Sequence, residues 1–357
     1  MKVITLVTST NTRPERDILK KMEREDQHPR ATLFADTLNS DLLDLRFLEF
    51  VTPKYRQNIY KLLPPALTQV IEAYLHRNNY DAIVSWAEQL GLPLAFLLKI
   101  TRQRVPHIAI WSWISKPKKA LLLKLTYTKF SKIILMSSMQ YNFAVDRLGI
   151  PESKVKLLKW PIDQIFWRPI LATTDMICSA GREMRDYATL LQAMEGLGIK
   201  CHIAVGAVPG KKDAWQQDLK NLPTSQESIT VGRKTYNELR NLYAQCKFIV
   251  VPLYPTDTDN GTTTILEAMA MGKAVISSRV DGQRDVIQEG KTGLFVPPQD
   301  PRSLREAIQY LWNNPKVAED MGNAGRKHIE QFHTLDNWVN EVKIIVEEAI
   351  SNHVKLK

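Results

Sequence analysis

The sequence predicts an α/β protein with two doubly wound parallel-sheet domains that face a common cleft. The chain has 357 residues, which is enough for two domains at about 150 residues each. Short β-branched runs alternate with longer amphipathic segments, and the alternation starts again after residue 170. Such alternation is typical of parallel sheets with helices on both faces. We expect domains over 1–160 and 171–335, joined by a linker over 161–170.

The first domain contains apolar runs that we interpret as buried strands, at 3–7, 81–86, 107–113 and 132–137. Between them lie helical patterns. Leu67, Val70, Ile71 and Tyr74, for example, are spaced i, i+3, i+4 and i+7, as on one apolar helix face.

The second domain repeats the pattern, with predicted strands at 175–181, 202–207, 228–232, 247–254, 273–278 and 292–298. Pro161 and Pro169 stiffen the expected linker between the domains. We expect the last segment, 336–357, to form a helix that crosses back to the first domain.

Composition excludes several classes of protein. Hydrophobic residues make up 44% and charged residues 24%, which argues against a disordered or low-complexity chain. The three cysteines are too few for a disulfide framework and have no paired spacing for zinc, so a reducing compartment is expected. The apolar run at 3–7 is shorter than a signal-peptide core, and no long apolar run could span a bilayer. We expect a cytoplasmic protein.

The net charge of +10 is concentrated in the first domain. Residues 1–160 contain 25 basic and 14 acidic side chains, whereas 161–357 contain 23 and 24. The segment Lys116–Lys132 is rich in lysine around the apolar stretch ALLLKLTYT. Anionic lipid headgroups or an acidic acceptor would match this charge, which could also be a solvated face without a partner. Nucleic acid is not expected, because the sequence has no nucleic-acid-binding motif.

The most informative stretch is 250–300. Here Asn260, Gly261, Thr262 and Thr263 lead from a strand into a helix. Backbone N–H groups at a helix start bind anions such as phosphate, and threonine hydroxyls add donors. Taken alone, the loop is better explained as a helix cap made by Asn260 and Thr262.

Charged residues extend this site. Asp259 and Glu267 can direct two carboxylates to one ligand, and carboxylates suit vicinal hydroxyl groups. Arg182 and Arg185 follow the first strand of the second domain, and guanidinium groups match phosphate oxygens. Together, these residues predict a site for a diphosphate flanked by sugar or ribose hydroxyls, which is a nucleotide sugar.

Residues 175–340 resemble the donor-binding domain of the group 1 glycosyltransferases, the GT-B-fold enzymes of family 4. The resemblance is carried by GREMRDYATLLQA, ITVGRKTYNELRNLYAQCKFIVVPLY, LEAMAMGKAVISS, GQRDVIQEGKTGLFVPPQDPRSLREAI and QFHTLDNW. The phrase KWPIDQIFWRP is similar to the family's interdomain linker.

The resemblance implies transfer of a hexose from a UDP-, GDP- or ADP-linked donor to an acceptor hydroxyl, with retention of configuration and without a cofactor or metal. Arg182 and Arg185 match the family's basic pair on the diphosphate, although the second is usually lysine. Glu267 matches the second glutamate of the family's paired-glutamate motif, which holds the ribose, and Asp259 falls at the first. Gly181 and Gly261 belong to the same diphosphate-binding set.

Two further donor contacts follow from the resemblance. Arg233 lies in VGRKTY, which we expect near the base. The family's glycine-rich loop after the first strand is replaced by hydroxyl-bearing residues, among them Thr10, which can donate to phosphate.

The acceptor side departs most from the family. Where many members have a histidine, the chain has Trp111, Ser112 and Trp113, and we expect His107 to be structural. Tryptophan faces stack on sugars, so Trp86, Trp111 and Trp113 are candidate acceptor contacts, with Glu88 as an acceptor-side carboxylate. The acceptor would be a sugar, a lipid or a small molecule, and Lys116–Lys132 would bind the inner face of a membrane.

Alternatives remain open. The sequence DTD at 257–259 resembles a metal-binding motif of another fold, but the arginines make a cation less necessary. A nucleotide-sugar epimerase and a catalytically silent nucleotide-sugar-binding protein would also fit the donor residues.

Overall fold

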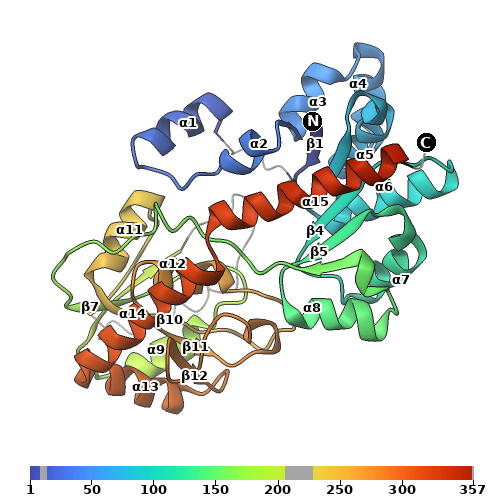
Figure 1. Cartoon of the computed structure of the whole chain (residues 1–357). Coiled ribbons are helices and arrows are strands. Elements are labelled where there is room, and N and C mark those ends of the chain that lie inside the picture. The colour runs from blue at the N-terminus through green and yellow to red at the C-terminus, as the bar shows by residue number, and fades with distance from the viewer. Residues whose placement is uncertain (9–13, 206–227, 356–357) are drawn as a thin grey trace. The chain divides into compact units, whose positions relative to one another are not determined.

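The computed structural model of the protein describes residues 1–8, 14–205 and 228–355 (Figure 1). The chain divides into two compact units. Unit 1 comprises Met1–Lys21, Ala31–Lys159 and Asp336–Lys357, and unit 2 comprises Met22–Arg30 and Trp160–Leu335. One change of unit falls between Lys159 and Trp160. The sequence pattern gave no indication that Met22–Arg30 is part of the second unit.

Unit 1 is built on a parallel sheet of six strands in the order β2-β1-β3-β4-β5-β6. The strands are β1 (Val3–Leu6), β2 (Ser40–Leu43), β3 (Ala82–Ser85), β4 (His107–Trp111), β5 (Lys132–Leu135) and β6 (Val155–Leu157). Its main helices are α1 (Arg16–Arg24, shared with unit 2), α2 (Leu33–Thr37), α3 (Leu45–Val51), α4 (Lys54–Tyr60), α5 (Pro65–His76), α6 (Glu88–Ile100), α7 (Pro117–Thr126), α8 (Ser138–Asn142) and α15 (Leu335–Lys355).

Unit 2 has a second parallel sheet, in the order β12-β11-β10-β7-β8-β9. Its strands are β7 (Met176–Ala180), β8 (Lys200–Ala204), β9 (Ile229–Gly232), β10 (Cys246–Val251), β11 (Ala274–Ser278) and β12 (Gly293–Val296). Its helices include α9 (Tyr187–Met194), α11 (Tyr236–Gln245), α12 (Thr262–Ala270), α13 (Pro301–Asn313) and α14 (Pro315–Phe332). The predicted class, two doubly wound parallel-sheet domains, is confirmed.

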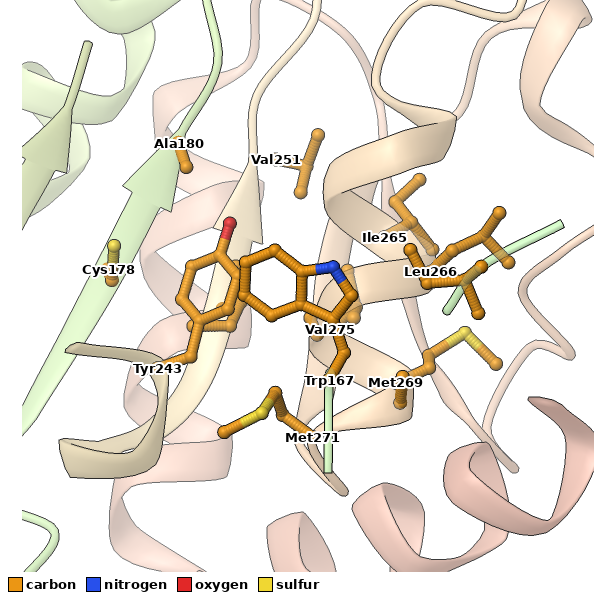
Figure 2. Packing of buried hydrophobic residues seen from close by; sticks show 14 of the residues in the cluster. Trp167, Cys178, Ala180, Tyr243, Val251, Ile265, Leu266, Met269, Met271 and Val275 are labelled. Carbon is orange, nitrogen blue, oxygen red and sulfur yellow. The ribbon is translucent and has the colours of Figure 1, made fainter. Parts of the chain in front are cut away.

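The central strands of each sheet are buried on both faces, which explains why they form continuous apolar runs in the sequence. Figure 2 shows one core of unit 2, in which the rings of Trp167 and Tyr243 lie 5.7 Å apart between centroids. Cys178, Cys201 and Cys246 are all buried free thiols. Because these clusters hold the strands rigidly, the loops at the strand ends are well positioned for ligands.

The segment Met22–Arg30 is fastened to the rest of unit 2 by ion pairs. The carboxylate of Asp26 accepts from Arg240 at 2.8 Å and from Arg168 at 2.6 Å. These hydrogen bonds lower the pKa of Asp26 well below its usual value. The carboxylate of Asp163 accepts from Arg30 at 2.8 Å. Charge pairing therefore binds a segment from early in the chain to the second sheet domain.

Candidate functional site

The candidate site in unit 2 lies where the strand order of the sheet reverses. The chain runs outward from β7 through β8 and β9, and then in the other direction from β10 through β11 and β12. The loops after β7 and β10 are therefore neighbours, and doubly wound sheets bind ligands at this point. Two backbone hydrogen bonds join these loops: Asp186 N–H donates to the Pro252 carbonyl at 3.1 Å, and Tyr254 N–H to the Met184 carbonyl at 3.0 Å.

The loop after β7 begins with Gly181, which has a positive φ of 105° that favours glycine. A Cβ atom on Gly181 would also collide with the guanidinium of Arg185. Arg182 follows and is half-buried. The glycine is required both by its backbone conformation and by the close approach of a side chain.

Arg185 does not present its guanidinium group to a ligand as the sequence predicted. The side chain is only 5% exposed. Its Nε donates to the Ala180 carbonyl at 2.7 Å, Nη1 to the Glu183 carbonyl at 2.9 Å and Nη2 to Thr264 Oγ1 at 2.9 Å. Because three of its donors are committed to protein groups, Arg185 connects the β7 loop to α12 and is a positioning residue.

The loop after β10 enters α12 through Gly261, whose φ of 92° lies in the left-handed region. Gly261 is the N-cap residue, and no side chain caps the helix. The alternative interpretation, in which Asn260 and Thr262 cap the helix, is therefore wrong. The first-turn N–H groups of a nine-residue helix begin here, and such groups lack partners within their own helix.

Gln283, to which the sequence analysis gave no role, fixes the shape of this loop. Its Nε2 donates to the carbonyls of Asp259 and Asn260 at 2.8 Å each, and also to Thr262 Oγ1. Among the described residues, its buried Oε1 has no hydrogen-bond partner. The neighbouring Gly282 leaves no space for a Cβ atom beside the Thr258 carbonyl. The stretch GQ in GQRDVIQEG is the sequence signal that could have indicated this clamp.

The other predicted loop residues lie together, with different surroundings. One carboxylate oxygen of the half-buried Asp259 accepts from the indole of Trp160 at 2.5 Å. The amide of Asn260 donates to Thr258 Oγ1, so it stabilises the loop. Thr262 is 4% exposed and its hydroxyl accepts a hydrogen bond from Gln283, whereas Thr263 is exposed. Thr263 is therefore the more accessible hydroxyl of the two.

Glu267 lies on α12, one turn below the loop, and is 6% exposed. Its Oε2 accepts from the hydroxyl of Tyr243 at 3.2 Å. Burial raises the pKa of Glu267 to about 8, and the Tyr243 hydrogen bond and the charge of Arg185 only partly oppose the increase. At neutral pH the carboxyl group is mostly protonated, so it can both donate and accept hydrogen bonds.

Two further residues were predicted to contact the donor, of which the structure describes Arg233 only. Arg233 is exposed just after β9. Thr10 lies outside the described residues. Within 1–8, 14–205 and 228–355, no three His, Cys, Asp or Glu side chains are grouped so that they could hold a metal ion.

In unit 1, Trp111 cannot stack on a sugar as predicted. It is 1% exposed and packs against Phe130 at 5.1 Å between ring centroids. His107 is fully buried, its Nε2 lies 3.0 Å from Ser85 Oγ, and desolvation lowers its pKa to about 3. Both residues therefore belong to the core. This position was expected for His107 but not for Trp111.

Glu88 and Trp113 contact each other. The N–H of Trp113 donates to Glu88 Oε1 at 2.8 Å, and Lys119 lies 3.4 Å from Glu88 Oε2. The ammonium of Lys116 lies 3.8 Å from the centroid of the Trp113 ring. Glu88 therefore joins the start of α6 to the segment before α7, and the Trp113 ring is partly covered by lysine.

Trp86, another predicted acceptor residue, borders a cavity. It is half-buried and packs against Phe34 at 4.9 Å and Trp338 at 5.5 Å between ring centroids. It also lines a cavity of about 300 Å³ at the end of the first sheet. Among the four predicted acceptor residues, the position of Trp86 supports contact with a ligand, whereas Trp111 is buried in the core.

Part of unit 2 is similar in sequence to known proteins. Residues 173–328 match the family model of the group 1 glycosyl transferases. A glycosyltransferase of Methanocaldococcus jannaschii is 30% identical over 118 residues, which is 33% of this chain and 32% of that protein. A sulfoquinovosyl transferase of Arabidopsis thaliana is 29% identical over 121 residues, covering 33% of this chain and 23% of the relative. The chain thus matches about a third or less of the length of these relatives.

Some solved structures have a fold similar to that of the whole chain. A sucrose-phosphate synthase from Thermosynechococcus elongatus has a TM-score of 0.75 at 17% identity, covering 99% of this chain and 100% of that one. The Anabaena protein HepE, solved with UDP-glucose, has a TM-score of 0.70 at 16% identity with the same coverage. The protein has the two-domain GT-B fold of glycosyltransferases. More narrowly, its residues 173–328 are similar to the group 1 glycosyl transferases, whose family model they match.

Proposed function

We propose that the protein is a retaining glycosyltransferase that moves a hexose from a UDP-, GDP- or ADP-linked donor to an acceptor hydroxyl. One observation carries the proposal. Within a segment that matches the family, Arg182, the start of α12 and Glu267 come from the two loops and the helix that meet at the switch point of the sheet. A cationic group, a helix N-terminus and a buried carboxyl together fit a diphosphate linked to a ribose.

Each residue has a distinct task in this proposal. Arg182 and the N–H groups of Gly261 and Thr263 stabilise the charge that develops on the departing diphosphate. Glu267 binds the ribose hydroxyls. Asp259 binds hydroxyls of the donor sugar. Arg233 lies at the base.

The transfer needs no cofactor in this scheme. The bond between the anomeric carbon and the phosphate oxygen breaks, and the acceptor oxygen bonds to the same face of that carbon. The acceptor proton passes to the departing phosphate oxygen, so atoms and charge balance. Because Arg182 and the helix N-terminus neutralise the leaving group, no metal is required.

Unit 1 would hold the acceptor, which we propose to be a lipid-linked or anionic molecule at the cytoplasmic face of a membrane. In the segment Lys116–Lys132, α7 exposes Leu121 by 62% and Leu125 by 49%, beside the exposed Lys118 and Lys124. Apolar and basic side chains together favour an anionic bilayer surface. No helix among the described residues has the length and hydropathy to cross a bilayer. If changing Lys116, Lys118 and Lys119 to Gln left binding to anionic vesicles unchanged, this membrane role of the segment would be wrong.

A catalytically silent nucleotide-sugar-binding protein is the second candidate. It is favoured by the burial of Arg185 and by the hydrogen bond that commits Asp259 to Trp160.

Turnover separates the two candidates. The protein is incubated with each nucleotide sugar and EDTA, with glucose or octyl glucoside as the acceptor. Release of nucleoside diphosphate only when an acceptor is present would support the enzyme, and NMR of the product would give its anomeric configuration. Binding without release over many hours would favour the silent protein.

A further inference from the structure

A cavity of about 300 Å³ occupies the switch point of the first sheet. The strand order reverses between β1 and β3, and the cavity is lined by residues that follow these two strands, Val7 and Thr8 after β1 and Trp86 after β3. The remaining lining consists of Ala31, Phe34, Ala35 and Leu42. The general rule for doubly wound sheets places a ligand here, and most of the lining side chains are apolar.

A second cavity, of about 400 Å³, adjoins the first. Ala35 and Leu42 line both cavities. From this shared wall the second cavity extends past Leu19 and Phe47 to Phe50. Charged residues also line it: Glu15, Arg16, Asp41, Asp44 and Arg46. Phe50 is 86% exposed, so the cavity ends at the surface of unit 1 beside an unburied aromatic ring.

The next helix along the chain, α4, is amphipathic, with its polar side toward the protein and its apolar side toward solvent. Its polar side chains face the protein: the guanidinium of Arg56 lies 2.9 Å from Glu72, and the hydroxyl of Tyr60 donates to Glu72 at 2.5 Å. Gln57 donates to the Thr52 carbonyl at 2.8 Å. Glu72 is fully buried on α5, so these contacts fix the orientation of α4.

The apolar side chains of this region therefore point outward. On α4, Tyr55 is 67% exposed and Ile59, one turn later, 57%. Leu62, two residues after the end of the helix, is 86% exposed. Soluble proteins normally cover such a stripe. We call Phe50, Tyr55, Ile59 and Leu62 the α4 face.

Basic residues flank the α4 face. Lys54 and Lys61 are exposed at the two ends of the helix. Residues 45–63 contain four basic side chains, of which Arg56 is paired with Glu72, and one acidic side chain, Glu49. An apolar face with a basic border complements a bilayer that contains anionic lipid, because its acyl region accepts the apolar side chains and its headgroups attract lysine.

We propose that the α4 face docks on an anionic lipid bilayer and that the two cavities receive the apolar chain of an amphiphilic acceptor drawn from it. The chain enters beside Phe50, passes Ala35 and Leu42, and brings its hydroxyl-bearing end toward Trp86. The acceptor assignment rests on the proposed glycosyl transfer, whereas bilayer docking and chain binding do not depend on it. The surface differs from the Lys116–Lys132 segment, although both belong to unit 1.

Vesicle flotation tests the docking. The full-length protein is mixed with phosphatidylcholine vesicles with or without roughly 30% phosphatidylglycerol. We expect binding to the anionic vesicles, which falls about tenfold or more in Ile59→Glu/Leu62→Glu and in Lys54→Gln/Lys61→Gln. The matched control is Ile344→Glu/Val354→Glu, which makes the same kind of change at exposed positions of α15 and should retain binding. Equal binding by the wild type and both α4 variants would overturn the docking proposal.

A series of alkyl glucosides below their micelle concentrations tests the cavities. Calorimetry should give a dissociation constant that falls about fourfold for each added methylene from hexyl to nonyl. Ala35→Leu, which fills the shared wall, should flatten this dependence, and unchanged thermal unfolding would show that it folds. No dependence on chain length in the wild type would overturn the chain-binding proposal. A nucleotide-sugar thermal shift on the same samples reports the donor site separately, so the failure of either idea can be recognised.

Discussion

Glu267 gives the protein a stability that should fall with rising pH. Its pKa is 4.5 as an ordinary glutamate and about 8 in the folded protein, because burial penalises the charged form. The folded state therefore holds this proton more tightly than the unfolded state does. The contribution to stability is complete below pH 4.5 and is lost as the pH rises through about 8. Between pH 5 and pH 8 the loss is about 3 kcal/mol, since the slope for one proton approaches about 1.4 kcal/mol per pH unit.

Urea unfolding of the wild type and Glu267→Gln at several pH values measures this loss. The amide has nearly the same shape, still accepts from Tyr243 and does not titrate. Groups that titrate in both proteins cancel in the difference of unfolding free energies. We expect the wild type to lose about 3 kcal/mol relative to Glu267→Gln between pH 5 and pH 8. A difference that stays constant over this range would refute the assignment of a raised pKa to this carboxyl group.

Four other substitutions, of which Arg182→Ala is the control for Arg185→Ala, test the packing of unit 2. Arg185→Ala leaves three acceptors without their buried donor and should lower the unfolding free energy in urea by about 3 kcal/mol, whereas Arg182→Ala should change it by less than about 1 kcal/mol. Thr235→Ala removes the capping box of α11 and should cost about 1 kcal/mol in the same assay. Asp26→Asn removes the carboxylate that pairs with Arg240, whose side chain is 6% exposed. Because the buried charge then has no ion-pair partner at this position, Met22–Arg30 should be held less tightly, and trypsin should cleave within it several-fold faster.

The sequence was sufficient to predict the two-sheet architecture, because central parallel strands are apolar throughout. The strands it did not indicate are β2 and β6, at the two edges of the first sheet. Ser40–Leu43 contains polar residues and Val155–Leu157 has only three residues, so neither forms the apolar run of a central strand. The docking of Met22–Arg30 was also invisible, because it depends on ion pairs between residues far apart in the chain.

The sequence predicted where the candidate site lies better than it predicted which contacts its side chains make. Loops at the ends of strands can be recognised from sequence, but the direction of a side chain cannot. Arg185 and Trp111 have the residue types that a site needs, yet both point into the core. Gln283 donates to backbone carbonyl groups, and no sequence motif shows which carbonyl groups a side chain will contact. The α4 face was missed because its apolar spacing is that of an ordinary helix, and only the contacts with Glu72 show which side faces solvent.

The most direct test of the central claim is a thermal-shift screen of the protein against UDP-, GDP- and ADP-sugars without added metal. A ligand at about 100 times its dissociation constant stabilises the protein by roughly 2.7 kcal/mol. We expect a clear shift with one nucleotide class in the wild type and none in Arg182→Ala. The absence of a shift with all three classes, in a well-folded wild-type sample, would contradict a nucleotide-sugar site at the start of α12.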